Sequence, residues 1–316
     1  MQRQNVPGTS SGASYPAAYY LVATDVLSWQ DTASSAGPAV PGHTLVGSGA
    51  DVGPIATLPD GNLLAEIVPA CANYSGNVDY PLYELAPTTR SIRRLSPALP
   101  GGGGGLYVSP NARELATARS TGPGGAVTVT VDDATTWHAV WMFREPGHGL
   151  VTDAAGGSQY FPNGPAWTPD GTALLYVEPD GIHRVARGGA DSLVAKSPDP
   201  DGCSWLDVGS NGSSLAAARA CPLGAVNDPG GGIELDLINP DGTVTTTVGQ
   251  IGESQCGLLV PARTTPAMLA DCENPEFVLY LASKGNQPRV LDQYGGTGSA
   301  HADYGTVNGR LGGFSW

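Results

Sequence analysis

The sequence predicts an all-β fold in which similar antiparallel sheets are arranged in a ring. Asp-Gly pairs stand between short apolar runs, a related segment recurs along most of the chain, and 45 Gly and 27 Pro occur among 316 residues. Asp-Gly between strand-favouring runs is a strong hairpin signal, because glycine adopts positive φ without strain. The apolar runs are too short for helices. Many short strands joined by tight turns follow from these observations.

The repeating unit is clearest in residues 165–187. Asp170-Gly171 and Asp180-Gly181 are expected to close two successive hairpins as type I′ turns, so that three consecutive strands form. The run Leu-Leu-Tyr-Val at 174–177 is continuously apolar, which predicts a strand buried on both faces. Residues 191–195 could add a fourth strand.

Related segments follow one another at intervals of roughly 40–60 residues, in or just beyond the range of a four-stranded unit. They are residues 57–68, 107–118, 165–177, 205–218 and 257–270, the last without the Gly turn. A strand followed by Ser/Thr/Leu-Pro-Asp-Gly, two residues, and Leu-Ala or Leu-Leu resembles the blade signature of TolB-like, WD40-like β-propellers. The resemblance covers nearly the whole chain. It implies the fold and selects no activity, since such propellers have many functions.

The two ends of the chain are expected to complete one blade together. Residues 17–23, 26–30 and 43–46 read as strands with no inner strand before them, whereas residues 311–316 read as an inner strand with nothing after it. Pairing the C-terminal strand with the N-terminal three would close the ring and remove two exposed sheet edges.

This arrangement predicts six four-stranded blades, or seven if the interval 126–164 contains a degenerate one. Residues 1–14 are rich in Ser, Gly and polar side chains and are expected to form a flexible linker. Residues 15–316 then form a single propeller domain, and we expect a monomer.

Four of the five cysteines are placed for disulfide bonds. Cys203 and Cys221 are nearly equidistant from one predicted hairpin turn, and Cys256 and Cys272 from the next. Residues equidistant from an antiparallel turn face one another closely enough to be bridged. Reduced core thiols are the alternative, followed by zinc, for which no Cys-x-x-Cys pair is present. Cys71 has no counterpart and is expected to be a buried free thiol.

Charge and compartment follow from composition. A net charge of -14 argues against nucleic acid and against anionic lipid as partners. No run approaches the ~20 apolar residues of a membrane helix, and residues 1–8 do not resemble a signal peptide. Disulfides would imply an oxidising compartment, so we expect an extracytoplasmic domain that meets a membrane only through an N-terminal anchor absent from this sequence. Arg greatly outnumbers Lys, and the resemblance is to actinobacterial propeller domains of this kind.

Chemical motifs give little direction. The sequence lacks a Gly-x-Ser-x-Gly elbow, a His-Glu-x-x-His motif, a phosphate-binding loop and a calcium loop, and its five His are scattered. We therefore expect no metal and no cofactor. Aromatic residues at similar inner-strand positions could line a central channel and stack on sugars or peptide side chains, or pack between blades. They are Tyr107, Trp167, Trp205 and Trp316.

These features favour a non-catalytic sensor or interaction module whose ligand is a protein, a small molecule or a glycan. One alternative is a propeller enzyme, a lyase or hydrolase of glycans, peptides or a small metabolite, with its site at the channel mouth. A second alternative is a lectin-like carbohydrate binder.

Overall fold

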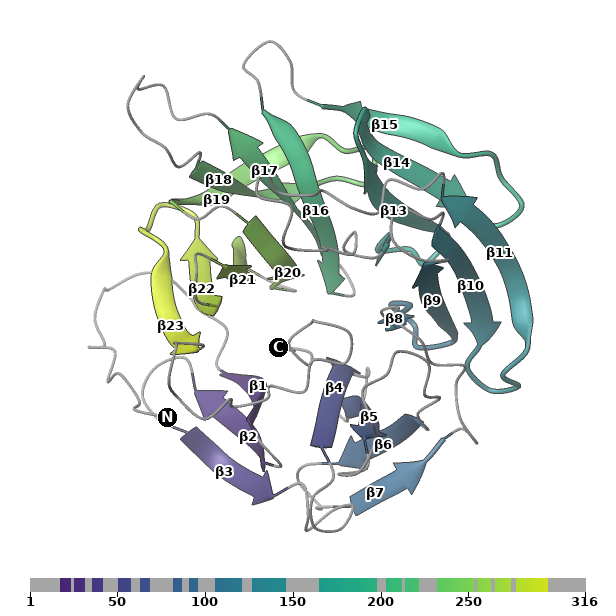
Figure 1. The fold of residues 1–316 in the computed structure, drawn as a ribbon, viewed down its shortest axis with the longest axis vertical. Helices are drawn as coiled ribbons and strands as arrows, with labels where there is room; N and C mark the ends of the chain where they lie inside the picture. The colour runs from purple at the N-terminus through teal and green to yellow at the C-terminus, as the bar shows by residue number, and fades with distance from the viewer. Residues whose placement is uncertain are drawn as a thin grey trace.

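The structure is a computed structural model in which antiparallel sheets surround a central axis (Figure 1). It describes residues 18–23, 26–31, 36–41, 51–57, 63–68, 82–86, 91–95, 106–120, 127–145, 165–197, 203–211, 214–221, 232–252, 255–262, 265–273 and 277–294. All regular elements in these ranges are strands, and the described residues contain no helix that is long and apolar enough to cross a membrane. The all-β prediction is confirmed.

Six sheets follow one another along the chain, and we number them one to six. Sheet one contains β1 (Ala18–Ala23), β2 (Val26–Asp31) and β3 (Ala36–Pro41). Sheet two contains β4 (Asp51–Thr57), β5 (Leu63–Val68), β6 (Leu82–Ala86) and β7 (Ser91–Arg94). Sheet three contains β8 (Leu106–Val108), β9 (Glu114–Ser120), β10 (Val127–Asp133) and β11 (Ala139–Glu145).

The second half of the chain repeats the pattern. Sheet four contains β12 (Ala166–Trp167), β13 (Ala173–Glu178), β14 (Gly181–Ala186) and β15 (Ser192–Lys196). Sheet five contains β16 (Ser204–Asn211), β17 (Ser214–Cys221), β18 (Gly232–Ile238) and β19 (Val244–Ile251). Sheet six contains β20 (Gln255–Pro261), β21 (Ala267–Glu273), β22 (Phe277–Ser283) and β23 (Arg289–Tyr294). Figure 1 shows first strands such as β4, β8, β16 and β20 nearest the centre and last strands such as β7, β11 and β23 at the periphery.

Sheet one differs in part from its prediction. Its third strand is β3 at Ala36–Pro41, whereas the predicted strand at 43–46 lies outside the described residues. The strand β3 contains two prolines, which an outer strand tolerates, and among the described strands it pairs only with β2. Residues 311–316 also lie outside the described residues. Ring closure, and with it the complete blade count, therefore stays a prediction.

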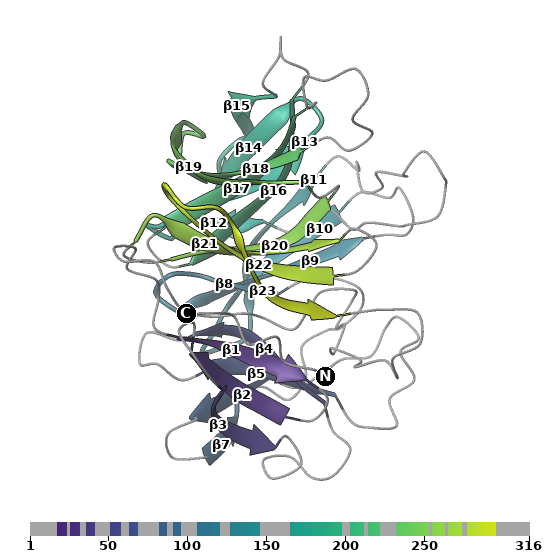
Figure 2. The ribbon, with the colours of Figure 1, turned by 90° about the vertical axis from the view of Figure 1, so that its left-hand side faces the viewer.

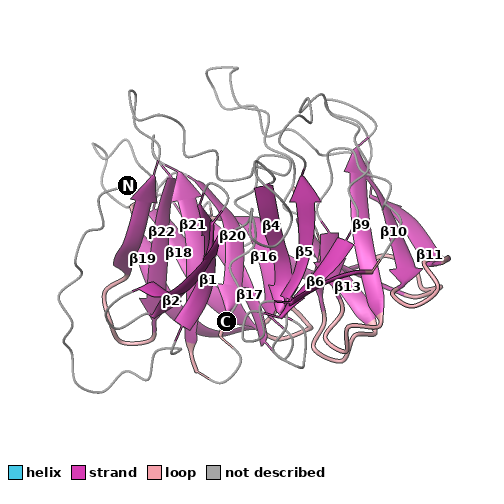
Figure 3. Ribbon diagram, turned by 90° about the horizontal axis from the view of Figure 1, so that it is seen from below, coloured by secondary structure: helices cyan, strands magenta, loops and turns pink. Residues whose placement is uncertain are grey.

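The Asp-Gly turns form where predicted but are not of type I′. Pro169 and Asp170 occupy the middle of a turn in which the Gly171 amide donates to the Thr168 carbonyl at 2.8 Å, and only Gly171, at φ +68°, has positive φ. In the second hairpin Glu178 pairs with Gly181, so the loop is Pro179-Asp180. Proline fixes φ near -65°, which excludes a type I′ turn here. Figure 3 shows the described turns in pink along one face of the ring.

The core lies between successive sheets, which pack face to face (Figure 2). Alternate side chains of sheet five face sheet four on one side and sheet six on the other, as the two-residue period of a strand requires. The clusters on the two sides include Leu215, Ala217 and Ile238 toward sheet four, and Ala216, Ala218 and Leu235 toward sheet six. Sheet five is therefore buried on both faces.

The strand order separates long connections from short ones. In an antiparallel four-stranded sheet, the second-to-third connection and the link to the next sheet leave from one face of the ring. The other two connections leave from the opposite face. Wherever six or more residues separate consecutive described strands, both strand ends lie on the first face, which we call the connector face. On the opposite face, consecutive described strand ends are separated by five residues or fewer.

Candidate functional site

A polar cluster centred on Arg219 lies between sheets four and five. The Arg219 Nε donates to Asp236 Oδ2 at 3.1 Å, and its guanidinium also pairs with Glu234. The Thr247 hydroxyl donates to Asp236 Oδ1 at 2.6 Å. The guanidinium carbon lies 5.7 Å from the centre of the Trp205 ring. We call these five residues the Arg219 cluster.

Strand register explains why these side chains meet. Arg219 pairs with Trp205 on one neighbour and with Glu234 on the other, while Asp236 pairs with Thr247. Residues opposite one another on adjacent strands project to the same face of a sheet. A β-bulge at residue 206 shifts the register after Trp205, so that Asp207 pairs with Ala218 and faces sheet six.

Asp236 has no exposed surface, and its charge is compensated by Arg219 and by the Thr247 hydroxyl. A charge removed from water is stable only when it is paired and hydrogen-bonded, so these contacts hold the guanidinium in one orientation. The side chains of Arg219 and Glu234 keep 20% and 28% of their surface exposed. Because guanidinium has five N–H donors, the exposed part of Arg219 could donate to a carboxylate or carbonyl of a bound partner.

The Arg219 cluster lies toward the connector face. Trp205 is the second residue of β16, Arg219 is two residues before the end of β17, and Glu234 is the third residue of β18. At about 3.3 Å per strand residue, these positions lie within about 10 Å of the ends from which residues 197–203 and 222–231 depart. Long loops on a rigid scaffold commonly carry binding residues.

The aromatic residues predicted to line a channel pack between sheets where they are described. Trp167 is 1% exposed, its Nε1 donates to the Tyr107 carbonyl at 3.0 Å, and its ring meets Trp141 edge-on at 6.4 Å. Trp205 is 8% exposed and donates from Nε1 to the Lys196 carbonyl at 3.1 Å. The burial of Trp167 weighs against stacking on a ligand.

Tyr107 is half-buried against the same cluster as Trp167. Trp316 lies outside the described residues. A channel-lining role for these four aromatics stays a prediction. The structure shows in addition that Trp205 contacts the Arg219 guanidinium and donates to the Lys196 carbonyl.

The sequence contained a signal for the Arg219 cluster that the prediction overlooked. Glu234 and Asp236 alternate with Ile233, Leu235 and Leu237 on one strand. Charged residues at every second position of an otherwise apolar strand mark a polar face that must be paired if it is buried. The partner, Arg219, lies on the preceding strand and could be assigned only once the register was known.

The predicted cysteine pairs agree with the register. Cys256 and Cys272 are directly opposite on β20 and β21. Ser204 pairs with Ala220, so Cys203 and Cys221 occupy the next step of the same ladder. The two bridges stay a prediction that this register supports, and Cys71 lies outside the described residues.

The opposite face carries a recurring turn network. The Thr168 hydroxyl donates to Asp170 Oδ1 at 2.6 Å and accepts from the Ala173 amide at 3.1 Å. In sheet three, Ser109 and Asn111 make the same hydroxyl-to-Oδ1 contact at 2.9 Å. The Thr168 hydroxyl and the Thr172 amide lower the pKa of Asp170 below 3.8. These polar groups hold the turns in shape.

Asp133 caps the β10–β11 turn in a similar way, and the amides of Thr136 and Thr135, with the Thr136 hydroxyl, lower its pKa. His183 lies between two carboxylates, with Nδ1 2.9 Å from Asp191 Oδ2 and Nε2 2.8 Å from Asp180 Oδ1. In the part of the chain that the structure describes, no group of three or more His, Cys, Asp or Glu side chains is arranged to hold a metal ion.

Comparison with known proteins shows the fold. No protein-family model matches the chain, and no curated protein does. TolB from Acinetobacter baumannii is similar with a TM-score of 0.51 and 15% identity over 86% of this chain, which spans 64% of the TolB chain. A chain of a nidogen/laminin complex is similar with a TM-score of 0.52 and 10% identity, over 94% of this chain and 97% of that one.

A protein of unknown function from Desulfotomaculum acetoxidans is similar with a TM-score of 0.50 and 11% identity, over 87% of this chain and 95% of that one. Identities this low bear on the fold alone, and the actinobacterial resemblance stays a prediction. The chain has the all-β fold of the TolB-like propellers.

Proposed function

We propose that this chain is a non-catalytic propeller that acts as a sensor or interaction module outside the cytoplasm. Its binding surface would be the connector face, with Arg219 as a fixed contact. The orientation of Arg219 by the fully buried Asp236 supports this proposal most directly. A preoriented guanidinium near the end of a sheet is suited to binding an acceptor group of a partner.

The proposed location outside the cytoplasm is inferred from the cysteine pairs. Two cysteine pairs in register on successive sheets would form two disulfides in an oxidising compartment and would stay reduced in the cytosol. The exposed part of Arg219 can only donate hydrogen bonds, so the ligand must offer a carboxylate or carbonyl group. A protein, a small molecule or an oxidised sugar could carry that group.

The experiment compares wild type, Arg219→Ala and a matched control. The wild-type domain is immobilised and used to capture partners from an envelope fraction. The captured partner is then purified and titrated against each variant by calorimetry. Arg113→Ala is the control, because Arg113 is an exposed arginine in a turn on the opposite face. We expect Arg219→Ala to weaken binding at least about tenfold, the loss of about 1.4 kcal/mol, and the control to bind as wild type does.

Equal binding by all three proteins would place the contact elsewhere and contradict the proposal. The same proteins separate the alternatives. Turnover of a glycan, peptide or metabolite substrate by the purified domain would identify an enzyme, with its site at the channel mouth. Selective binding on a glycan array would identify a lectin-like protein.

A further inference from the structure

The outer strand of sheet three, β11, is a sheet edge at the periphery of the ring (Figure 1). It pairs with β10 on one side, and within the described residues no strand pairs with its other side. An unpaired edge presents a row of backbone N–H and C=O groups to any chain that can lie alongside it. This strand is distinct from the Arg219 cluster, which lies between sheets four and five.

The inward face of β11 is held firmly. Trp141 meets Trp167 edge-on at 6.4 Å and stacks with Phe143 at 5.7 Å, and Phe143 lies 5.7 Å from Tyr176. Aromatic pairs of this kind stabilise the fold by more than the burial of their surface alone. The edge is therefore anchored to sheet four, and a rigid edge loses little entropy when a second strand is added.

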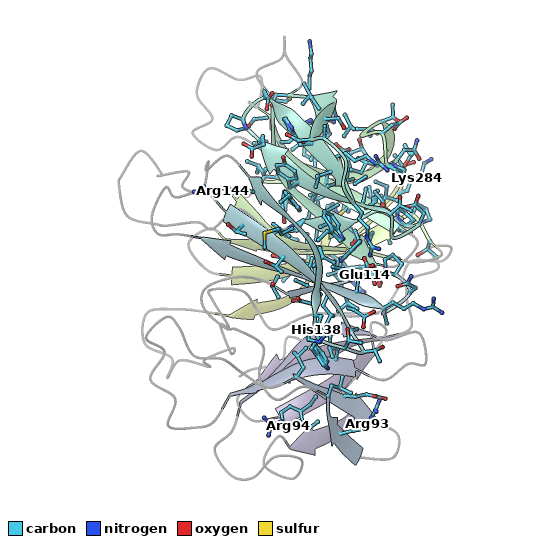
Figure 4. All side chains as sticks on the ribbon, turned by 90° about the vertical axis from the view of Figure 1, so that its right-hand side faces the viewer. Arg93, Arg94, Glu114, His138, Arg144 and Lys284 are labelled. Atoms are coloured by element: carbon cyan, nitrogen blue, oxygen red, sulfur yellow. The ribbon has the colours of Figure 1, made fainter. Side chains whose placement is uncertain are left out.

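The outward face of β11 carries an exposed row at every second position. Val140 is 42% exposed, Met142 is 64% exposed, and Arg144 is exposed beyond them. Figure 4 looks onto this side of the ring, with Arg144 at one end of β11 and His138 just before the other. Residues at alternate strand positions share one face, so the row is a continuous stripe of two apolar side chains and one cation.

Two other outer strands, β7 and β15, are protected in the usual way. The strand β7 has four residues, of which Arg93 and Arg94 are exposed, and β15 has five and ends in the exposed Lys196. Short length and cationic side chains discourage pairing with another chain. The seven-residue β11 carries two of the four exposed large hydrophobic residues found among the described residues. It also carries an exposed cation, Arg144, but it is longer than either of those two strands.

We propose that β11 binds an extended peptide segment by strand addition. The peptide carries apolar side chains at two alternate positions, beside Val140 and Met142, and an acidic side chain opposite Arg144. Backbone hydrogen bonds along the edge supply the affinity and alternate side chains supply the selectivity.

Charge supports an acidic peptide. The chain has a net charge of -14, yet Arg144 is exposed on β11, as are Arg93 and Arg94 on β7, where Arg93 pairs with Glu84. Arg144 has no ion-pair partner among the described residues. An acidic segment would therefore be drawn to this side of the ring and repelled from the rest of the surface.

The test uses fluorescein-labelled nonapeptides with Val at two alternate positions, Glu at the third, and Thr between them. One peptide is made for each strand orientation, and binding to the full chain is followed by fluorescence anisotropy. Two further peptides carry N-methyl groups on the two alternate sets of amides. Strand addition uses the amides of one edge only, so we expect one methylated set to abolish binding and the other to retain it.

Charge reversal supplies the second readout. We expect Arg144→Glu to weaken binding of the Glu peptide about fivefold, near the upper end for an exposed ion pair, and a Lys peptide to restore it. The control is Lys284→Glu, an exposed reversal in a turn of sheet six that should leave binding unchanged. Met142→Lys should abolish binding while the melting temperature stays the same.

Several results would overturn the proposal. One is that neither Glu peptide binds. Another is that both methylated sets of amides change binding equally, and a third is that Arg144→Glu and Lys284→Glu do so. A concentration-dependent dimer that Met142→Lys dissociates would show a second copy of the chain on β11, and that result too would overturn it. The Arg219→Ala variant should bind the peptide as wild type does. The peptide proposal and the proposed function can therefore be tested, and can fail, independently of each other.

Discussion

Gly209 of β16 packs against the backbone of Leu259 on β20. A Cβ atom on Gly209 would lie 2.9 Å from the Leu259 Cβ and closer still to the Leu259 carbonyl oxygen. The contact brings the inner strands of sheets five and six together where no side chain fits between them. A glycine is required here for close approach of two backbones.

Gly209→Ala should therefore destabilise the protein. Backbone cannot move aside as a flexible side chain can, and overpacking of this kind costs about 1–3 kcal/mol. Urea unfolding would measure the loss. Gly252→Ala is the matched control, because no atom lies within 4 Å of the added methyl group and its φ is not positive. Equal stability of the two variants would contradict the contact.

Ala112→Gly should stabilise the protein. Ala112 has φ +55° in the turn where the equivalent residue of sheet four is Gly171, at φ +68°. A side chain in the left-handed region costs roughly 1–2 kcal/mol, part of which is offset by the greater freedom of glycine in the unfolded chain. We expect a net gain of roughly 0.5–1 kcal/mol by urea unfolding.

The converse substitution is the control for this turn. Gly171→Ala places a methyl group no closer than 3.6 Å to Pro110, so only the backbone conformation is strained. It should destabilise by about 1 kcal/mol. Shifts of the same sign in both variants would show that φ is not the cause.

Asp170→Asn should make the free energy of unfolding less dependent on pH in acid. Hydrogen bonds from Thr168 and Thr172 lower the pKa of Asp170 in the folded state below 3.8. A carboxylate with a lowered pKa stabilises the fold above its unfolded pKa, and this contribution disappears as pH falls through the folded pKa. The asparagine keeps the Oδ1 acceptor, as Asn111 does in sheet three, where the Arg113 amide donates to it at 3.0 Å.

Urea unfolding at about pH 7 and about pH 3 tests this prediction. The decrease in the free energy of unfolding between the two pH values should be smaller for Asp170→Asn than for wild type. Thr168→Val removes the hydroxyl that holds the turn and should destabilise at both pH values. An unchanged pH dependence in Asp170→Asn would contradict the assignment.

Arg219→Ala should leave Asp236 buried and uncompensated. Removal of one partner from a buried ion pair costs about 3–5 kcal/mol, and the partial exposure of Arg219 places the expected loss near about 3 kcal/mol. Arg187→Ala is the comparison, because Arg187 pairs with Glu114 while 54% exposed. Exposed pairs contribute about 0–1 kcal/mol. If thermal unfolding shows similar losses of stability for Arg219→Ala and Arg187→Ala, the Arg219 cluster does not act as a buried ion-pair network.

The cysteine register predicts two bridges, Cys203–Cys221 and Cys256–Cys272. Peptide mapping by mass spectrometry under non-reducing conditions should find both linkages. Each closes a loop of somewhat under twenty residues, for which the expected stabilisation is about 3 kcal/mol. Reduction should lower the melting temperature of wild type and leave a variant with all four cysteines replaced by serine unchanged. Five titratable thiols in the unfolded, unreduced protein, instead of the one of Cys71, would contradict the bridges.

The repeat of short strands and the positions of the turns could be predicted without the structure. The Thr168–Ala173 turn is held by hydrogen bonds among six consecutive residues, so its information is local. The detailed turn type was wrong, because an Asp-Gly pair alone does not state how many residues separate the two strands. The same locality explains why cysteines equidistant from a turn could be paired.

Tertiary structure decided which side chains meet between sheets. Trp167 was placed correctly on an inner strand, but its burial depends on Tyr107, sixty positions earlier, and on Trp141 of an outer strand. The meeting of Trp205, Arg219 and Asp236 likewise depends on register across three strands and on one bulge. A two-residue period assigns a side chain to a face of its own strand. What that face touches depends on the twist and packing of whole sheets.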